Sequence, residues 1–248
     1  MIDLSGKTVL ITGASSGIGE ALAVALARER CRLLLVARRR EVLQALADRI
    51  RSSAADVDIF VADVRDAGQC AAAVGRAVEK WDRIDVAILS AGVGVYRRVH
   101  EFDAVEAGDL IAVNVTGLIY CVGALLPVML RQQAGMIVGL SSLAGHFVSP
   151  VSSVYSASKA AVTTFLKGMR LGLRRHGIGV LTVEPGYVHT PMTAQNKRMP
   201  FVISADDAAE RIVRAIRQGR SVLRFPWPMT IAARLAGCLP EILARRLT

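Results

Sequence analysis

Two residues of this chain, Tyr155 and Lys159, have the types and the spacing that acid–base chemistry requires. If the segment around them is helical, the two side chains project from one helix face, because they are four residues apart. An ammonium about 4 Å from a phenol would favour the phenolate by roughly 4 kcal/mol at an effective dielectric of about 20. This is at most about three pKa units, enough for a tyrosine to exchange a proton near neutral pH. An isolated pair of this kind is more often a surface contact without chemistry, so the surrounding elements must decide.

Composition excludes several classes of protein. The 248 residues suit one large α/β domain or two small ones, and 52% of them are hydrophobic, which allows a large core. The N-terminus carries Asp3 and no basic region before its apolar run, so we expect no secretory signal. The four cysteines have neither CxxC nor zinc-ligand spacing, which indicates reduced thiols in a cytoplasmic protein and no metal site.

Net charge and hydropathy limit the kinds of partner that this protein can have. Basic residues exceed acidic ones by ten, 31 against 21, which fits a nucleic acid, an anionic membrane or an anionic ligand. The arginines form small clusters and no long basic stripe, so a nucleic acid is not expected. Residues 110–130 carry no charge over a membrane-spanning length. We favour a helix buried between a sheet and a partner subunit, because α/β patterns flank the segment and no second such span follows.

Short apolar runs alternate with helical patterns along the chain. Strands are predicted at residues 7–12, 32–37, 57–62, 86–89, 136–140, 178–184 and 221–225. Helices are predicted after Gly19 and at residues 41–50, 71–81, 110–130, 155–175 and 205–218. This alternation predicts a single α/β domain, residues 1–248, with a doubly wound parallel sheet and helices on both faces. Ligands of such sheets bind at the carboxyl ends of the strands, where Ser142 follows its strand.

A glycine-rich turn directly follows the first strand and precedes a helix. Its small residues would admit a phosphate to the free N–H groups at the helix N-terminus. The turn spans residues 13–19 with glycines spaced G-x3-G-x-G, and such a triplet is a weak signal by itself. An ordinary strand-to-helix turn would need only one or two glycines. The turn therefore indicates a nucleotide site only in combination with the other motifs.

The end of the second strand predicts which dinucleotide binds. Arg38 stands nineteen residues after Gly19, where a site for NAD places an acid that accepts bonds from the ribose hydroxyl. An arginine can instead pair with the 2′-phosphate of NADP(H). Arg39 and Arg40 add positive potential, although either could face solvent at the start of the next helix. We predict NADP(H) as cofactor, the alternative being that Arg38 is only a solvated charge at a strand end.

Together these motifs resemble the short-chain dehydrogenase/reductase family over residues 7–225. The matching segments are TGASSGIG at 12–19, DV at 63–64, AG at 91–92, NVTG at 114–117, SS at 141–142, YSASK at 155–159 and PG at 185–186. The resemblance is to NADP-preferring members of bacterial type. It implies a Rossmann-type fold and an oxidoreductase that interconverts a carbonyl and a secondary alcohol with a nicotinamide cofactor.

The resemblance also implies four catalytic residues, Asn114, Ser142, Tyr155 and Lys159. The family serine lies thirteen residues before the tyrosine, which selects Ser142. Tyr155 would donate its proton to the substrate oxygen as hydride arrives, and Ser142 would hydrogen-bond the same oxygen. Lys159 would lower the pKa of Tyr155 and bind the ribose hydroxyls. Asn114 would hold a water that links Lys159 to solvent, unless it is a structural residue of its helix.

The cofactor-binding residues that the resemblance implies lie mostly at strand ends. They are Gly13, Ser15, Ser16, Gly17, Ile18, Gly19, Arg38, Asp63, Val64, Ser90, Ala91, Gly92, Tyr155, Lys159, Pro185, Gly186, Val188 and Thr190. Ser90 departs from the family asparagine, which bears on how the cofactor loop packs near the adenine ribose. Two nearby histidines, His146 and His189, are interpreted as packing or loop residues, although His146 could touch the substrate.

Three further features concern substrate and partners. The apolar segment 191–204 is predicted to be a substrate lid, which favours a medium-sized hydrophobic carbonyl or alcohol. The apolar helices at 110–130 and 157–173 predict a homodimer or homotetramer. Residues 226–248 form an amphipathic segment that either caps the cleft or an interface, which we favour, or lies on an anionic membrane. The alternative functions are a dinucleotide-binding sensor or scaffold and a peripheral membrane reductase of lipid-like substrates.

Overall fold

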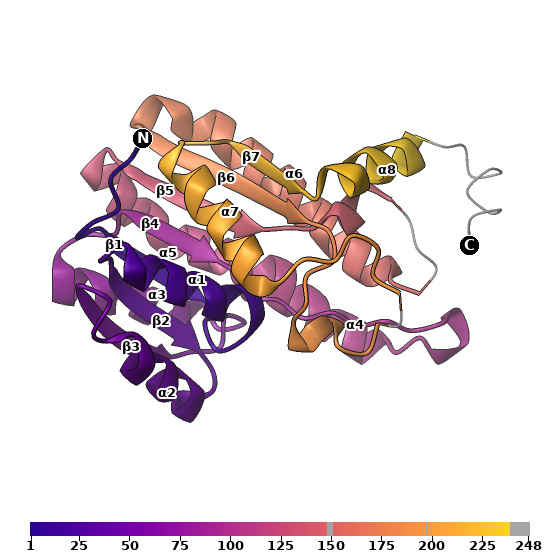
Figure 1. Ribbon diagram of the computed structural model, residues 1–248, viewed down its shortest axis with the longest axis horizontal. Helices are drawn as coiled ribbons and strands as arrows, with labels where there is room; N and C mark the ends of the chain where they lie inside the picture. Colours follow the sequence, from indigo (N-terminus) through magenta and orange to yellow (C-terminus); the bar gives the residue numbers. More distant parts are fainter. Residues whose placement is uncertain (148–150, 197, 239–248) are drawn as a thin grey trace.

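Seven parallel strands form one sheet in the order β3-β2-β1-β4-β5-β6-β7, in a computed structural model that describes residues 1–147, 151–196 and 198–238 (Figure 1). The strands are β1 (Thr8–Thr12), β2 (Arg32–Ala37), β3 (Asp56–Val61), β4 (Val86–Leu89), β5 (Gly135–Leu140), β6 (Ile178–Pro185) and β7 (Val222–Phe225). The order reverses between β1 and β4, which is the crevice where doubly wound sheets bind ligands. The predicted α/β class and parallel sheet are confirmed.

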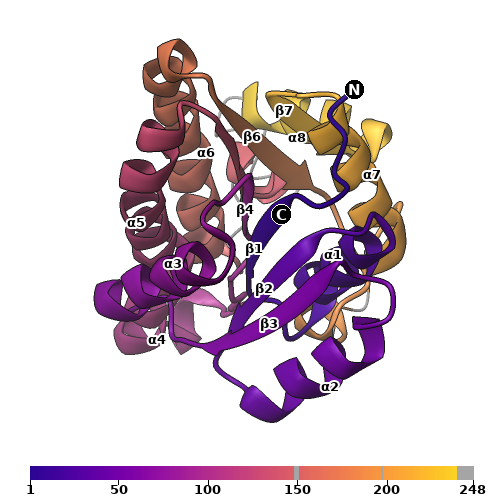
Figure 2. The same ribbon diagram turned by 90° about the vertical axis from the view of Figure 1, so that its left-hand side faces the viewer.

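Helices cover both faces of the sheet (Figure 2). One face packs against α1 (Gly17–Arg28), α2 (Arg40–Ile50) and α7 (Ala205–Arg217). The other face packs against α3 (Ala67–Trp81), α5 (Gly117–Gln132) and α6 (Ser153–Leu173). The strands between them are buried on both sides, as their continuous apolar runs indicate.

The apolar segment 110–130 belongs to a longer helix that α4 (Ala104–Ile111) begins. A π-helical turn, η2 (Ala112–Thr116), joins α4 to α5, and the whole helix is long and apolar enough to cross a membrane by length and composition alone. One side of α5 packs into the core through Leu118, Leu125 and Met129. This packing agrees with the sheet side of the predicted arrangement, whereas burial of the outer side against a partner subunit stays a prediction.

Two helices begin earlier than the hydrophobic pattern predicts, because aspartates cap them. Asp66 accepts a hydrogen bond from the N–H of Gln69, so that α3 starts at Ala67 and not near residue 71. Asp103 accepts from the N–H groups of Val105 and Glu106, so that α4 starts at Ala104. The first turns of both helices are polar or exposed, so apolar periodicity does not mark them.

The predicted amphipathic segment contains α8 (Trp227–Cys238), while residues 239–248 lie outside the described part of the chain. On its inner side α8 places Met229 against Gly186 in the turn after β6. Its outer side exposes Trp227, Ile231 and Leu235, which are spaced by four residues along one stripe. The inner contact agrees with a capping helix, and the membrane interpretation of the outer stripe stays a prediction.

Candidate active site

Two adjoining cavities lie at the carboxyl ends of the strands, where the sequence motifs meet. The first, of about 240 Å³, is lined by residues that follow β1, β2, β3 and β4. The second, of about 130 Å³, is lined by the start of α1, the end of β5, the start of α6 and the turn after β6. Ser16, Ser90 and Gly92 line both. Every residue predicted to bind the cofactor lines one cavity or the other, and Ser142 lines the second.

Ser142 is held at the end of β5 by its role as a helix cap. It is the N-cap of a short 3₁₀ helix, η3 (Leu143–His146), and its Oγ accepts from the N–H of Ala144 at 3.1 Å. The same Oγ donates to the carbonyl of Pro185 at 3.3 Å, a long bond that another acceptor can replace. Ser142, the predicted catalytic serine, is therefore held in place by one bond that it accepts and by one long bond that it donates.

Lys159 is buried at the start of α6 with only 6% of its surface exposed. Its Nζ donates to the backbone carbonyl of Leu140, the last residue of β5, at 3.0 Å. Burial disfavours the charged ammonium and lowers the pKa of Lys159 to about 8. The ammonium also lies 5.6 Å from the centre of the Tyr155 ring, within the range of a cation–π contact.

The pKa of Tyr155 is raised, contrary to the sequence expectation. The side chain is half-buried at the second cavity, and this burial disfavours the charged phenolate and raises the pKa of Tyr155. Tyr96, whose ring lies 6.1 Å away, adds to the rise, whereas the hydrogen bond with Ser142 opposes it. The expected lowering by Lys159 is wrong for this form of the site, because the ammonium points to the Leu140 carbonyl and desolvation dominates.

Asn114 lies in the π-helical turn η2 and is 1% exposed. Its Oδ1 accepts from the N–H of Val93, and its Nδ2 donates to the carbonyl of Val93 and to Ser158 Oγ. Asn114 lines neither cavity. It nevertheless lies near Lys159, because a Cβ placed on Gly92 would be 3.3 Å from Asn114 Oδ1 and 3.5 Å from Lys159 Nζ. Asn114 thus connects the loop after β4 to α6, and the proposed water beside Lys159 stays a prediction.

The glycine loop packs so closely on neighbouring protein atoms that side chains are excluded at two of its positions. A Cβ on Gly19 would lie 2.3 Å from the carbonyl oxygen of Gly13 and 2.6 Å from Ser90 Oγ. Gly13 has a φ of +69° and would bring a Cβ within 2.7 Å of the Ala91 backbone. Ser90 donates its hydroxyl to the carbonyl of Thr12 at 2.8 Å, so the residue that replaces the family asparagine still ties β4 to β1. The loop and the N-terminus of α1 leave a cradle of the kind that phosphates occupy.

Arginines surround the mouth of the first cavity. Arg38 is exposed and lies 3.9 Å from the carboxylate of Asp63. Arg39 Nη2 donates to the carbonyl and to the Oγ of Ser15, at 3.0 and 2.9 Å, and so bridges from β2 to the glycine loop. Arg65 binds Asp63 through Nε and Nη2, which lowers the pKa of that carboxyl. Arg39 lines this cavity and contacts the glycine loop through Ser15, whereas the sequence alone also allows it to face solvent.

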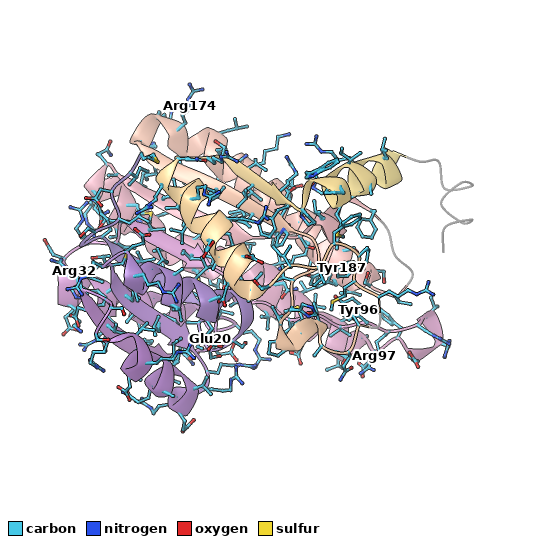
Figure 3. The ribbon with its side chains drawn as sticks, viewed as in Figure 1. Glu20, Arg32, Tyr96, Arg97, Arg174 and Tyr187 are labelled. Atoms are coloured by element: carbon cyan, nitrogen blue, oxygen red, sulfur yellow. The ribbon has the colours of Figure 1, made fainter. Side chains whose placement is uncertain are left out.

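The second cavity is closed by the turn after β6 and by the predicted lid. Val188 pairs with Ile203, and the N–H of His189 donates to the carbonyl of Ile203, so the ends of segment 191–204 are joined. Met192, in this segment, lines the second cavity. Lys197, in the same segment, lies outside the described residues. Tyr96, which the sequence did not single out, lies beside Tyr155 at the same end of the sheet as Tyr187 (Figure 3).

Comparisons with known proteins agree with this geometry. A family model described as short chain dehydrogenase matches residues 7–200. An uncharacterized oxidoreductase of Myxococcus xanthus is 35% identical over the whole of both chains, and one of Staphylococcus saprophyticus is 34% identical over 88% of this chain and 94% of its own. A short chain dehydrogenase/reductase from Burkholderia phymatum, solved in complex with NAD, superposes with a TM-score of 0.88 at 27% identity, covering 95% of this chain and 94% of the other. Levodione reductase superposes with a TM-score of 0.84 at 27% identity, covering 92% of this chain and 99% of the other.

Replacing Lys159 by methionine tests whether burial of its ammonium lowers the stability of the folded protein. Its folded-state pKa of about 8 lies below the ordinary value of 10.5, so the unfolded chain binds more protons between these two pH values. Wild-type stability therefore rises with pH through this window, as the burial penalty is relieved. We expect Lys159→Met to be more stable than the wild type by about 1–3 kcal/mol near pH 7, with the gap closing towards about pH 10.5.

Urea unfolding of the apoprotein at several pH values measures this difference. Lys167→Met, at an exposed position of the same helix, is the matched control and should show no such pH-dependent gap. A difference between wild type and Lys159→Met that stays constant across the whole range would contradict the burial argument.

Proposed function

The chain belongs to the short-chain dehydrogenase family, and from this premise we propose that it is an NADP(H)-dependent reductase of a medium-sized hydrophobic carbonyl compound. The observation that carries the proposal is the juxtaposition of the two cavities. Arg38 and Arg39 flank the first, while Ser142, Tyr155 and Lys159 line the second. The product would be a secondary alcohol, and the reaction would be reversible.

The catalytic side chains provide a proton donor and an oxygen-binding hydroxyl on one cavity. When bound, the dinucleotide supplies the hydride that reduction of a carbonyl requires. The pKa of a free tyrosine is about 10 and burial raises that of Tyr155 further, so at neutral pH its hydroxyl holds a proton that it can donate to the substrate oxygen. Ser142 Oγ can exchange its long bond to Pro185 for one to the same oxygen, which stabilises developing negative charge. Lys159, with a pKa of about 8, can release a proton from Nζ near neutral pH and so help to restore the tyrosine.

The preference for NADP(H) rests on the charges at the first cavity. Arg38 has 63% of its side chain exposed, so its guanidinium is free to turn towards a phosphate. Arg39 is already held over the glycine loop by Ser15. Asp63 is the acid that lines this cavity, and Arg65 neutralises it, so it repels a 2′-phosphate little. The Burkholderia protein was solved with NAD, but the two arginines favour the phosphorylated cofactor here.

The substrate class follows from the lining of the second cavity. Met192 of the lid lines this cavity, and the ring of Tyr96 lies 6.1 Å from that of Tyr155. Flexible sulfur and aromatic side chains suit an apolar substrate better than a sugar. A dinucleotide-binding sensor or scaffold is the alternative, but the presence of Ser142, Tyr155 and Lys159 at one cavity favours an enzyme. A peripheral membrane reductase would need the outer stripe of α8 to bind lipid.

Turnover with NADPH and a panel of aldehydes, ketones and diketones tests the proposal. We expect the best kcat/KM with hydrophobic members of the panel. Tyr155→Phe should lower kcat by at least about 10²-fold, because the proton donor is lost, while NADPH still binds. Ser142→Ala should act in the same direction but more weakly. Tyr120→Phe, on the side of α5 away from both cavities, is the matched control, because it removes a hydroxyl and keeps the ring that the proposed oligomer would bury. Full turnover by Tyr155→Phe would refute the assignment, and nucleotide binding without any turnover by the wild type would favour the sensor.

Cofactor preference is tested by comparing NADPH with NADH. The wild type should prefer NADPH by at least about tenfold in kcat/KM, or roughly 1.4 kcal/mol. Arg38→Asp should erase or reverse this ratio while NADH turnover persists, and Arg39→Ala should lower it. Arg40→Ala removes an exposed arginine that lines neither cavity and should change the ratio much less than Arg38→Asp. Equal use of both cofactors by the wild type would remove the role given to Arg38 but not the reductase assignment.

We also propose that the protein is a cytoplasmic homodimer or homotetramer. The sides of α5 and α6 away from the sheet expose Ile119, Tyr120 and Leu171. A second copy would remove this apolar surface from water. Light scattering at micromolar concentration should show an oligomer, and Ile119→Glu should shift it towards the monomer. A wild-type monomer under these conditions would contradict the proposal.

A further inference from the structure

A buried carboxylate lies directly behind the turn that lines the second cavity. Glu184, next to Pro185 on β6, is 1% exposed, and its side chain binds Arg224 on β7 and His146 at the end of η3. None of the three lines either cavity, so the proposed reaction leaves them without a role. We propose that His146 and Glu184 are positioning residues that hold η3, and with it Ser142, in the geometry that catalysis needs. The proposal rests on the proposed function for its catalytic consequence.

The charge of Glu184 is already compensated without His146. Arg224 stands opposite Glu184 in the register of β6 and β7, and its Nε donates to Glu184 Oε2 at 2.5 Å. Arg170 of α6 adds positive potential nearby, although its own bonds go to Val180 and Thr182. A buried carboxylate needs a partner, and the neighbouring strand supplies one. The contribution of His146 is therefore the connection that it makes rather than a missing countercharge.

That connection fastens η3 to β6 at both ends. Ser142, at the start of η3, donates to the carbonyl of Pro185, and His146, at its end, binds the carboxylate of Glu184 at 2.7 Å. Glu184 and Pro185 are consecutive residues. The bond from His146 is to a buried, charged acceptor and is stronger than the long bond from Ser142. Of these two side-chain bonds between η3 and the end of β6, that of His146 is therefore the stronger.

The opposite side of η3 is fixed by a close approach to α6. A Cβ on Gly145 would lie 2.9 Å from the backbone nitrogen of Ala160 and 3.0 Å from the carbonyl carbon of Lys159. The short helix thus lies between the backbone that carries Lys159 and the strand that carries Glu184. Release of one side would let Ser142 move relative to Tyr155 and Lys159. A misplacement of about 1 Å at a reacting group can lower a rate by about 10²-fold.

Two variants of His146 separate this role from a purely structural one. His146→Gln places an amide nitrogen at a similar reach and keeps a donor to Glu184, whereas His146→Leu has similar bulk and no donor. We expect His146→Leu to lower kcat by at least about tenfold, with KM and the Kd for NADPH within about threefold of wild type. His146→Gln should restore kcat to within about threefold of wild type. His176→Leu, at a half-buried histidine far from the site in the fold, is the control.

A double-mutant cycle and hydrogen exchange test whether His146 affects kcat through Ser142 and η3. In a Ser142→Ala background, His146→Leu should lower kcat by less than about twofold, because the group it positions is already gone. Deuterium uptake in peptides that cover residues 141–147 should rise in His146→Leu and not in His146→Gln. Thermal unfolding of every variant is recorded alongside, and His146→Ala replaces His146→Leu if the leucine variant does not fold.

The outcomes are distinct. Wild-type kcat and wild-type exchange in His146→Leu would overturn the proposal, as would an equal loss of kcat in His146→Leu and His146→Gln. A full additive loss in the Ser142→Ala background would show that His146 does not act through Ser142 and would also overturn it. If the wild type turns over no carbonyl substrate, the proposed function fails, while the exchange comparison still decides whether His146 holds η3.

Discussion

The bond from Lys159 Nζ to the carbonyl of Leu140 is the constraint on which the site depends. It places an ammonium in a nearly closed space between the end of β5 and the start of α6, at a desolvation cost that lowers the pKa of Lys159. Gly92 lies beside this lysine and beside Asn114, and a Cβ there would make a tight contact with Asn114 Oδ1 at 3.3 Å. The π-helical turn at Asn114 widens the helix where its amide binds both Val93 and Ser158. Strand end, loop and two helices are thus arranged around one buried cation.

The two cavities differ in the side chains that line them. Arginines gather at the first, where a phosphate would bind, and groups that exchange protons gather at the second. Ser16, Ser90 and Gly92 belong to both, so small residues at the crossover of the sheet connect them. The hydrogen bond from Ser90 to Thr12 explains how this chain does without the family asparagine.

Much of this arrangement could be predicted from sequence, because strand ends are local features. Apolar runs located all seven strands to within a residue or two, and parallel topology then required Gly13, Arg38, Asp63 and Ser142 to meet at one edge. The starts of α3 and α4 were missed because aspartate caps, not apolar periodicity, determine them. The raised pKa of Tyr155 was missed for a different reason. Helical spacing places Tyr155 and Lys159 on one face, but it says nothing of the Leu140 carbonyl that takes the ammonium.

The remaining features that the sequence does not predict are contacts between segments far apart in the chain. Arg39 bridges to Ser15, Tyr96 lies beside Tyr155, and His146 reaches Glu184 across separate elements. No spacing rule connects such residues, because only the packed sheet brings them together. His146 shows the difference most clearly. In sequence it is a histidine four residues after Ser142, whereas in the fold it binds a buried carboxylate behind the active site.

The central claim is that this site keeps Tyr155 protonated as a donor, through desolvation that outweighs the nearby ammonium. Ultraviolet difference spectroscopy of tyrosinate formation in the apoprotein, with the Tyr155→Phe spectrum subtracted, measures this ionisation directly. The account predicts no ionisation of Tyr155 from about pH 6 to about pH 9, with titration only above the ordinary value of about 10. A tyrosine that ionises near neutral pH in the wild type and is absent from Tyr155→Phe would contradict it.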